Sequence, residues 1–350
     1  MAMTDARPEA GTAGRSAREV LQWSRDQVEP ALKAAVATMP QATQRITNYH
    51  FGWQDEEGRP ANGDGGKALR PALALLAAET VGGLSDVAVP AAVAVELVHN
   101  FSLLHDDVMD ADATRRHRAT AWTVFGINAA ILAGDALLSL AFDVLADSGH
   151  PAAHEGTRIL GTAVQDLVDG QLADSHFETR TDVELAECVR MAELKTGALL
   201  GASCALGAVF GGGRPDQVEH LRRFGADLGL AFQYVDDLLG IWGDSAVTGK
   251  PVHSDLSRRK KSLPAVAALT SGTDAGRELA VLYHDTLPLS DVELARAALL
   301  IDQAGARTKS QDEADALLAS ALGQLASAHP VAPAAVELGK LARLATRRDH

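Results

Sequence analysis

Four aspartates stand within seven residues at the end of a long apolar segment. They lie in the stretch SLLHDDVMDADATRR, residues 102–116. On a helix, Asp106 and Asp110 are one turn apart and share a face. Carboxylates placed this way at the edge of an apolar core are costly unless a cation lies beside them. The stretch therefore predicts either a solvated helix face or a metal-binding site.

A second acidic pair follows another apolar segment. In FQYVDDLLGIWGD, residues 232–244, Asp236 and Asp237 repeat the first arrangement. Two such pairs, each at the end of an apolar helix, could face each other. Carboxylate oxygens suit Mg²⁺, which usually shares its ligands with substrate phosphates. The second pair therefore favours a magnesium site for a phosphorylated ligand over a solvated helix face.

Basic residues accompany both acidic stretches. In a chain of net charge -14, cations beside acidic motifs suggest that a multiply charged anion binds there. Arginine suits bidentate phosphate contacts, and lysine acts as a point charge. Any single one of these residues is more often a solvated surface charge, so the inference rests on their joint arrangement. The residues are Lys67, Arg70, Arg115, Arg116, Lys195, Lys250 and Lys260.

The composition limits the classes to which the protein could belong. The chain has 350 residues, of which 47% are hydrophobic and only 4% aromatic, and Ala and Leu dominate. This composition favours helices. The negative charge argues against a nucleic-acid partner or an anionic membrane surface. Cys188 and Cys204 lack metal-ligand spacing and no secretory signal is recognisable, so we expect buried thiols in a cytoplasmic protein.

Successive apolar segments with helical spacing are expected to position these residues. We predict a disordered tail over 1–16 and one all-α domain over 17–350, with a loop or small hairpin over 50–67. The segment 196–213 is long enough for a membrane span, but its Gly and Ala content and Lys195 at its start favour a buried helix. The expected helices are Leu69–Val81, Pro90–Asp110, Thr120–Asp147, His154–Phe177, Val183–Val209 and Asp216–Trp242.

The motifs, taken in order, resemble the polyprenyl synthetase family of all-trans prenyl diphosphate synthases. They are GGKALRP, ELVHNFSLLHDDVMDADATRR, GDALL, DGQLAD, KTGAL, FQYVDDLL, GKPVHSDL and KKSLP, and they cover roughly residues 65–264. The resemblance implies a single large bundle of long antiparallel helices around a central cavity, of the isoprenoid synthase type. It further implies a homodimer and about three Mg²⁺ ions in each active site.

The resemblance also implies a role for individual residues. Asp106 and Asp110 would bind Mg²⁺ from one wall and Asp236 from the other, supported by Asp107 and Asp237. The isopentenyl diphosphate site would comprise Lys67, Arg70, His99 and Arg116, although His99 could instead be a core histidine. The allylic diphosphate would contact Arg115, Lys195, Thr196, Gln233, Lys250 and Lys260, and Gln171 and Asp174 would line the cavity.

The implied reaction depends on charge rather than on a side-chain nucleophile. Mg²⁺ and the basic residues would stabilise the leaving diphosphate while the allylic C–O bond ionises. The resulting allylic cation would alkylate isopentenyl diphosphate, and a proton would pass to the released diphosphate. This agrees with the absence of a recognisable Ser/His/Asp or Cys/His signature in the sequence.

Two positions depart from the family pattern. Gly240 stands where the second motif usually carries a third acid. Asp244 is eight residues after Asp236, roughly 12 Å along a straight helix, so it cannot simply replace that acid. Ala68 occupies a place where a basic residue is common. We therefore expect an active enzyme with a tighter Mg²⁺ requirement or weaker binding.

Product length is expected to depend on Phe101 and Ser102, five and four residues before Asp106. On a helix, Phe101 lies further down the pocket than the aspartates, so its ring could stop the growing chain. An aromatic residue there, with no insertion in the first motif, resembles short-chain synthases, notably those that make geranylgeranyl diphosphate. The alternative is that Phe101 is an ordinary core residue.

Two other functions compete with this interpretation. A terpene cyclase on the same fold would also ionise an allylic diphosphate, but it would not need the isopentenyl diphosphate site that Lys67, Arg70 and Arg116 suggest. A non-catalytic subunit of a heteromeric synthase should have lost an acidic motif. Gly240 is a small step in that direction, but both aspartate pairs remain.

Overall fold

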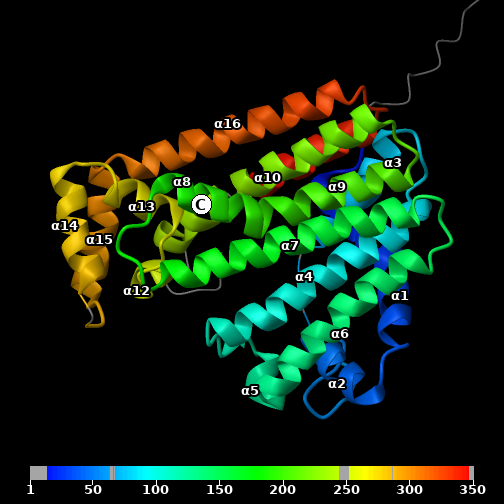
Figure 1. Ribbon diagram of the computed structural model, residues 1–350, viewed down its shortest axis with the longest axis horizontal. Coiled ribbons are helices and arrows are strands. Elements are labelled where there is room, and N and C mark those ends of the chain that lie inside the picture. Colours follow the sequence, from blue (N-terminus) through cyan, green and yellow to red (C-terminus); the bar gives the residue numbers. More distant parts are fainter. Residues whose placement is uncertain (1–13, 64–65, 67, 244–251, 286, 347–350) are drawn as a thin grey trace, which may run out of the picture.

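The computed structural model describes residues 14–63, 66, 68–243, 252–285 and 287–346. Helices account for 75% of the chain, which confirms the predicted all-α fold (Figure 1). The first helices are α1 (Ala17–Val36), α2 (Gln41–His50), α3 (Leu69–Thr80), η1 (Asp86–Ala88) and α4 (Val89–Met109). A hairpin of β1 (Thr114–Arg115) and β2 (Arg118–Ala119) follows, then α5 (Ala121–Phe125), α6 (Ile127–Ala146) and α7 (Ala153–Phe177).

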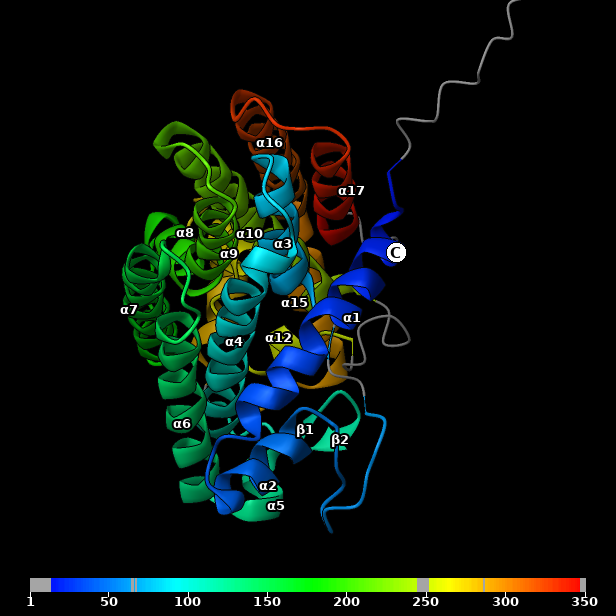
Figure 2. The ribbon, with the colours of Figure 1, turned by 90° about the vertical axis from the view of Figure 1, so that its right-hand side faces the viewer.

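The second half of the chain is also helical. It contains α8 (Leu185–Ala192), the π-turn η2 (Glu193–Gly197), α9 (Ala198–Phe210) and α10 (Pro215–Trp242). The remaining helices are α12 (Ser254–Ser257), α13 (Leu263–Leu269), α14 (Asp274–His284), α15 (Asp291–Gln303), α16 (Ala306–Ser327) and α17 (Ala334–Thr346). In Figure 2, α1 crosses the bundle beside α17 and α4, and the β1–β2 hairpin and α2 lie at one end.

The middle of the bundle is formed by helices that are apolar on nearly every side. In α9 every residue after Ala198 is buried, from Leu199 to Phe210. A helix that is hydrophobic all round is expected in the core of a large bundle. The segment expected as a buried helix therefore is one, and it packs against α3, α7 and α10.

Several predicted helices are interrupted. The segment expected over 120–147 forms α5 and α6 because Gly126 has a φ of 91°, which a helix does not allow. The segment expected over 183–209 contains the π-turn η2 between α8 and α9. Within 50–67, a bridge between Gln54 and Pro60 forms the expected small hairpin.

The β1–β2 hairpin after α4 was not predicted. Its two turn residues, Arg116 and His117, have φ values of 50° and 61°. Hairpin turns of type I′ require positive φ at both central residues, and Asn-Gly or Asp-Gly is the usual signal for them. Arginine and histidine give no such signal, so the sequence pattern does not indicate the turn.

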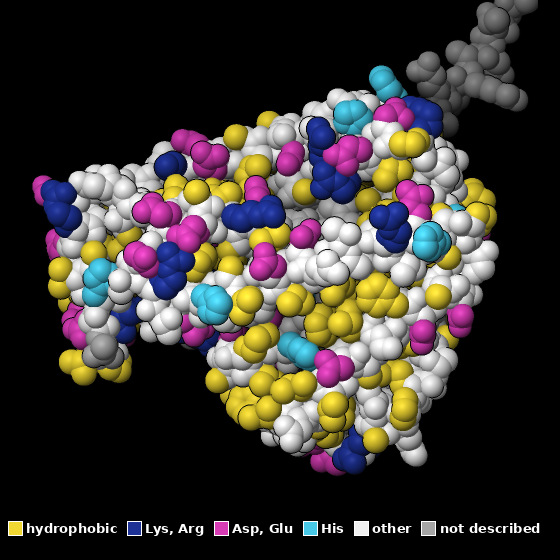
Figure 3. All heavy atoms as spheres, in the orientation of Figure 1, with side chains coloured by type: hydrophobic (Ala, Val, Ile, Leu, Met, Phe, Trp, Pro, Cys, Tyr) yellow, Lys and Arg dark blue, Asp and Glu magenta, His cyan; other side chains and the backbone are white. Residues whose placement is uncertain are grey.

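Three helical segments are long and apolar enough to cross a membrane by length and composition. They are Asp86–Met109, Ile127–Ala146 and Leu185–Phe210. Two of them are largely buried within the bundle, at 67% and 83%, but Ile127–Ala146 is only 39% buried. Figure 3 accordingly shows hydrophobic side chains gathered over α6 and α5.

Candidate active site

The two aspartate motifs lie near the C-terminal ends of two helices. Asp106 is in the last turn of α4 and Asp110 caps that helix, while Asp236 precedes the end of α10 at Trp242. Neither last turn carries a basic residue. Because the C-terminal end of a helix dipole is negative, carboxylates there are unfavourable without a cation. Burial, with a smaller contribution from Asp110, raises the pKa of Asp106 to about 6, although Lys195 opposes the shift.

The second acid of each pair is held by the protein itself. Asp107, whose side chain is 1% exposed, accepts a 2.6 Å hydrogen bond from Arg115 Nε. Asp237, whose side chain is 3% exposed, accepts a 2.9 Å bond from the backbone N–H of Leu263. The first acid of each pair is half-buried instead. The two members of each pair therefore have different environments.

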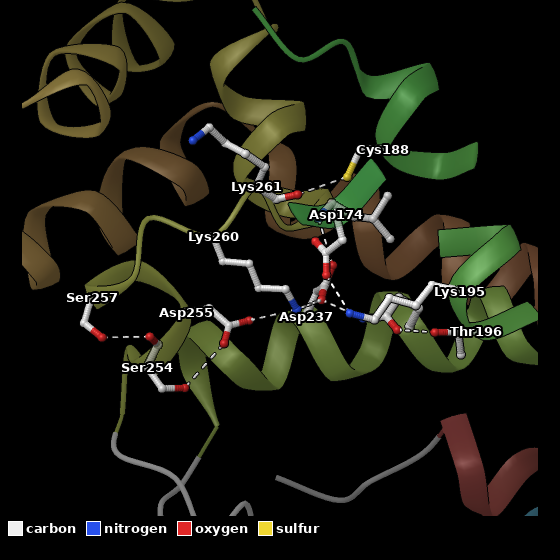
Figure 4. Close-up of polar contacts among 12 residues, drawn as sticks. Asp174, Cys188, Lys195, Thr196, Asp237, Ser254, Asp255, Ser257, Lys260 and Lys261 are labelled. Carbon is white, nitrogen blue, oxygen red and sulfur yellow. Dashed lines mark hydrogen bonds and ion pairs between the residues drawn. The ribbon is translucent and has the colours of Figure 1, made fainter. Parts of the chain in front are cut away.

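A continuous chain of hydrogen bonds links η2 to the second motif. Thr196 Oγ1 donates to Gln233 Oε1 at 2.7 Å, and Gln233 Nε2 donates to Asp237 Oδ1 at 2.9 Å. Lys260 Nζ lies 3.3 Å from the same oxygen (Figure 4). The orientation of the Gln233 amide is fixed because its oxygen accepts and its nitrogen donates. Asp237 also holds the pKa of Lys260 well above its usual range, so this lysine stays charged.

Lys195 reaches the site from the π-turn. Its Nζ lies 2.6 Å from Asp174 Oδ2 on α7, and both side chains are about a quarter exposed or less, at 24% and 20%. Burial raises the pKa of both Asp106 and Asp110; Asp174 adds to this shift and Lys195 opposes it, so the pair acts electrostatically on the first motif. No feature of the sequence predicts the π-turn, a distortion that is frequent at functional sites.

A second group of basic residues lies beside His99. Burial, followed by Arg70 and Arg116, lowers the pKa of His99 well below its usual value, so its ring is neutral. Burial also lowers the pKa of Arg70 to about 10, with Glu96 opposing the shift. The buried Nε of Arg70 has no hydrogen-bond partner among the described residues. A buried cluster of arginines of this kind could hold an anionic ligand.

Two further residues lie near this cluster but belong to none of the sequence motifs, so they were not predicted as site residues. His50, at the end of α2, forms a 3.1 Å hydrogen bond with Asn100 Oδ1. The Asn100 amide nitrogen donates to Glu96 Oε1 at 3.1 Å, so its oxygen must accept and His50 Nε2 must carry the proton. Arg25, on α1, donates to the Gly66 carbonyl at 2.7 Å.

The remaining predicted residues are placed as follows. Phe101 is buried, with its ring edge against His105 at 4.8 Å between centroids, and Ser102 Oγ donates to the His99 carbonyl at 2.8 Å. Gln171 is buried on α7, and its Oε1 has no partner within the described chain. Lys67, Lys250 and Asp244 lie outside the described residues.

The donor atoms of the site are suited to Mg²⁺. Asp106 and Asp236 are half-buried and Asp110 is exposed, and carboxylates are the hard oxygen donors that Mg²⁺ prefers. In the described part of the chain, no three His, Cys, Asp or Glu side chains are grouped so that they could hold an ion by themselves. Mg²⁺ usually keeps several waters and shares substrate phosphates, so one or two carboxylates per ion suffice. The residues fit ions shared with a diphosphate.

Comparisons with known proteins give a family and close relatives. The polyprenyl synthetase family model matches residues 59–299. The (2E,6E)-farnesyl diphosphate synthase of Mycobacterium tuberculosis is 46% identical, over 88% of this chain and 86% of that protein. The geranylgeranyl diphosphate synthase of the same organism is 42% identical, over 95% of this chain and 94% of that protein.

Solved structures agree with this result. A polyprenyl synthetase from Streptomyces coelicolor A3(2) has a TM-score of 0.90 and 46% identity, and the match covers 94% of this chain and 99% of that one. A polyprenyl synthase from Caulobacter crescentus, crystallised with calcium and isoprenyl diphosphate, has a TM-score of 0.80 and 26% identity. That match covers 96% of this chain and 100% of the Caulobacter chain.

Proposed function

Because the chain belongs to the polyprenyl synthetase family and is a prenyltransferase of its short-chain all-trans branch, we propose that its product is geranylgeranyl diphosphate. It would form this product from isopentenyl diphosphate and an allylic diphosphate, in the cytoplasm. The family alone leaves the product open, since close relatives are named for both the fifteen-carbon and the twenty-carbon product. The choice between these two products rests on the residues that precede Asp106 on α4.

The observation that supports the twenty-carbon product is the arrangement of Ser102 and Phe101 on α4. Ser102 lies four residues before Asp106, hence on the same helix face, and its small side chain is tied to its own helix. Phe101 precedes Ser102, and its ring is in edge contact with the His105 ring. The growing chain would therefore pass the small side chain of Ser102 first, with the aromatic ring of Phe101 beside it. We propose that Phe101 stops the chain only after it has passed Ser102.

The basic residues would hold the two substrates in separate places. Lys195, Lys260 and Arg115 would bind the leaving diphosphate, because Asp174, Asp237 and Asp107 already orient them. A preoriented cation stabilises developing negative charge without reorganisation during the reaction.

Isopentenyl diphosphate would bind on the other side, at the buried basic cluster. Arg70 and Arg116 would contact its phosphates, with Lys67 from the preceding loop, and the neutral ring of His99 would donate a hydrogen bond. The proton lost from the new chain would pass to the departing diphosphate that Lys195 and Lys260 hold nearby.

Asp106, Asp110 and Asp236 would hold Mg²⁺. When bound there, the ions supply Lewis-acid stabilisation of charge on the leaving diphosphate. The pKa of Asp106, raised to about 6 by burial, supports this assignment, because a buried carboxylate without a cation is unfavourable.

A product assay tests the proposal. Purified protein is incubated with Mg²⁺, isopentenyl diphosphate and, separately, dimethylallyl, geranyl and farnesyl diphosphates, and the products are identified by mass before and after phosphatase treatment. A twenty-carbon prenyl diphosphate as the end product is expected. A fifteen-carbon or much longer end product would contradict the product assignment but keep the reaction. A cyclic hydrocarbon formed without isopentenyl diphosphate would indicate a cyclase, and no turnover with any donor would indicate a non-catalytic subunit.

We also propose a homodimer that uses the exposed apolar face of α6 and α7. Ile127 and Leu132 on α6 are 51% and 65% exposed, and Val168 and Leu172 on α7 are 49% and 52% exposed. Contiguous exposed apolar surface of this kind is typical of an interface. Light scattering should give twice the 36.7 kDa chain mass for the wild type. The Leu132→Glu variant should be monomeric, and a dimer that survives this change would place the interface elsewhere.

A further inference from the structure

Arg118 connects the β1–β2 hairpin to the end of α2 and to the loop that follows α2. In the hairpin it pairs with Arg115 across the turn. Its Nη1 donates to the Tyr49 carbonyl at 3.1 Å, and its Nη2 donates to the Gln54 carbonyl at 3.3 Å. The planar fork of arginine can hold two acceptors in fixed positions, which lysine cannot do. The hairpin and α2, which lie at the same end of the molecule in Figure 2, are therefore joined by this side chain.

The guanidinium of Arg118 packs against both ends of the loop. It lies over the ring of Tyr49, 4.4 Å from the centroid, and the Tyr49 hydroxyl donates to the Ala119 carbonyl at 2.8 Å. A β-carbon on Gly52 or Gly63 would stand 3.2 Å or 3.1 Å from Arg118 Nη1, so side chains at these positions would crowd the guanidinium. The Gly63 N–H donates to the Gly52 carbonyl at 2.9 Å and closes the loop. Arg118 thus fixes the closed loop 52–63 relative to the hairpin.

The same two segments meet again at the basic cluster beside His99. A β-carbon on Gly66 would stand 2.9 Å from Arg116 Cζ, so the guanidinium of Arg116 packs directly on Gly66. Gly66 is three residues after Gly63, and Arg116 is two residues before Arg118. Each partner of this second contact is therefore close in sequence to a segment that Arg118 holds. The position of the Arg116 guanidinium should depend on the contacts of Arg118.

Arg115, the cross-strand partner of Arg118, has a separate support. Its Nε donates to Asp107 Oδ1 at 2.6 Å, and the Asp107 side chain on α4 is 1% exposed. Loss of the Arg118 contacts should therefore displace Arg116 more than Arg115. Under the proposed function, Arg116 contacts isopentenyl diphosphate and Arg115 contacts the allylic diphosphate. The two substrates should then respond differently to a change at position 118.

We propose that Arg118 is a positioning residue for the isopentenyl diphosphate site and that it acts through Arg116. The inference rests on the proposed function, because it deepens the assignment of Arg116 to that substrate. It also gives the loop 52–63 a role, as the support against which Arg118 aligns the hairpin. The competing explanation is that Arg118 contributes to the stability of the fold alone.

Steady-state kinetics of the full-length protein, with each substrate varied in turn, separates these explanations. Arg118→Lys keeps the charge but can reach only one of the two carbonyls. We expect KM for isopentenyl diphosphate to rise about tenfold. The KM for geranyl diphosphate and kcat should stay close to their wild-type values. A role in stability alone would lower the amount of folded enzyme without changing either KM. An unchanged KM for isopentenyl diphosphate, or an equal rise in both KM values, would overturn the inference.

Tyr49→Phe is a second and milder variant. It removes the hydrogen bond to the Ala119 carbonyl and keeps the ring beneath the Arg118 guanidinium. It should raise KM for isopentenyl diphosphate selectively, by a smaller factor than Arg118→Lys.

Arg45→Lys is the matched control. Arg45 is exposed, donates to the Glu56 carbonyl at 3.0 Å and lies 5.6 Å from the centroid of the Phe125 ring. It therefore contacts the same loop and an aromatic ring, but in the described part of the chain it makes no hydrogen bond with the hairpin. Arg45→Lys should leave kcat and both KM values unchanged.

A double variant tests whether Arg118 acts through Arg116. Arg116→Ala alone should raise KM for isopentenyl diphosphate. Adding Arg118→Lys to Arg116→Ala should raise it no further, because the effects of residues that act together do not add. Two effects that multiply would overturn the inference.

The same variants distinguish failure of this inference from failure of the proposed function. If Arg116→Ala raises KM for isopentenyl diphosphate and Arg118→Lys does not, only the role of Arg118 is wrong. If Arg116→Ala leaves this KM unchanged, the substrate lies elsewhere and both assignments are overturned. A wild type that transfers no prenyl group would overturn the proposed function and this inference with it.

Discussion

Gly197 in the π-turn and Gly229 on α10 meet backbone to backbone: a β-carbon on Gly229 would stand 2.7 Å from the Gly197 Cα atom. On the opposite side of the π-turn, a β-carbon on Gly170 of α7 would stand 2.9 Å from the Leu194 carbonyl carbon. The π-turn thus packs directly against the backbones of α7 and α10, because glycines stand at both contacts. Lys195 and Thr196, which it carries, are positioned by this contact.

Gly229→Ala should displace the π-turn and the residues it carries. We expect a loss of about 1–3 kcal/mol in the free energy of unfolding, from overpacking. We also expect at least about a tenfold loss in kcat/KM for the allylic substrate, since small displacements of binding groups are costly. Gly323→Ala on α16, where a β-carbon meets nothing within 4 Å, is the control and should stabilise the protein slightly. Full activity in a folded Gly229→Ala variant would contradict the positioning role.

Phe101→Ala should lengthen the product beyond twenty carbons, because the ring that stops the chain is removed. Phe210→Ala is a matched control, since Phe210 is equally well buried but lies at the far end of α9, stacked on His150. Each substitution should lower the free energy of unfolding by about 3–5 kcal/mol. Mass analysis of the products should show a change in length for Phe101→Ala alone. An unchanged product would mean that Phe101 is an ordinary core residue.

His50 should make the protein less stable in mild acid. Burial, followed by Arg116 and Arg115, lowers the pKa of His50 from 6.5 to about 3 in the folded chain. Below pH 6.5 the unfolded chain takes up a proton that the folded chain does not, so stability falls as the pH decreases. Between pH 7 and pH 5 this single group should cost about 2 kcal/mol.

The His50→Gln variant isolates this effect, because glutamine can still donate to Asn100 but does not titrate. Urea unfolding at pH 7 and pH 5 should show a smaller loss of stability for His50→Gln than for the wild type. His154→Gln, at an exposed histidine, should behave like the wild type. If both variants follow the wild type, His50 is not held neutral by the fold.

Arg15 should be important for stability although it precedes the first helix. Its guanidinium forms bonds of 2.7 Å and 3.0 Å with Glu337 Oε2 on α17, and the Glu337 side chain is only 3% exposed. Arg15→Ala leaves a buried carboxylate without its main partner, which should cost about 3 kcal/mol. The cost should be smaller when Arg15→Ala is combined with Glu337→Gln, since the neutral amide is easier to bury. Arg277→Ala, in a pair whose arginine is 66% exposed, should change stability by less than about 1 kcal/mol.

Local patterns predicted most of the fold. The all-α domain expected from residue 17 begins with α1 at Ala17, because Ser16 caps this helix and bonds with Glu19. The helices expected to end at Asp110 and Trp242 do end within one residue of those positions. Such boundaries depend on caps, glycines and a 3.6-residue apolar period, all of which lie within a few residues of each other. Of the tail expected over 1–16, residues 14–16 are described, and Arg15 contacts α17.

The sequence by itself determined the helical class, the family and the candidate acids and bases of the site, because these follow from composition and from the order of short motifs. Only the tertiary structure decided how deeply each of those residues is buried and which residues it contacts. It buried Asp107 and Asp237 and left Asp106 and Asp236 half-buried, and it brought Asp255 into the space beside Gly240. These outcomes depend on contacts between separate elements. Asp255 and Gly240, for example, are 15 residues apart in the sequence. The periodicity within a single helix contains no information about such contacts.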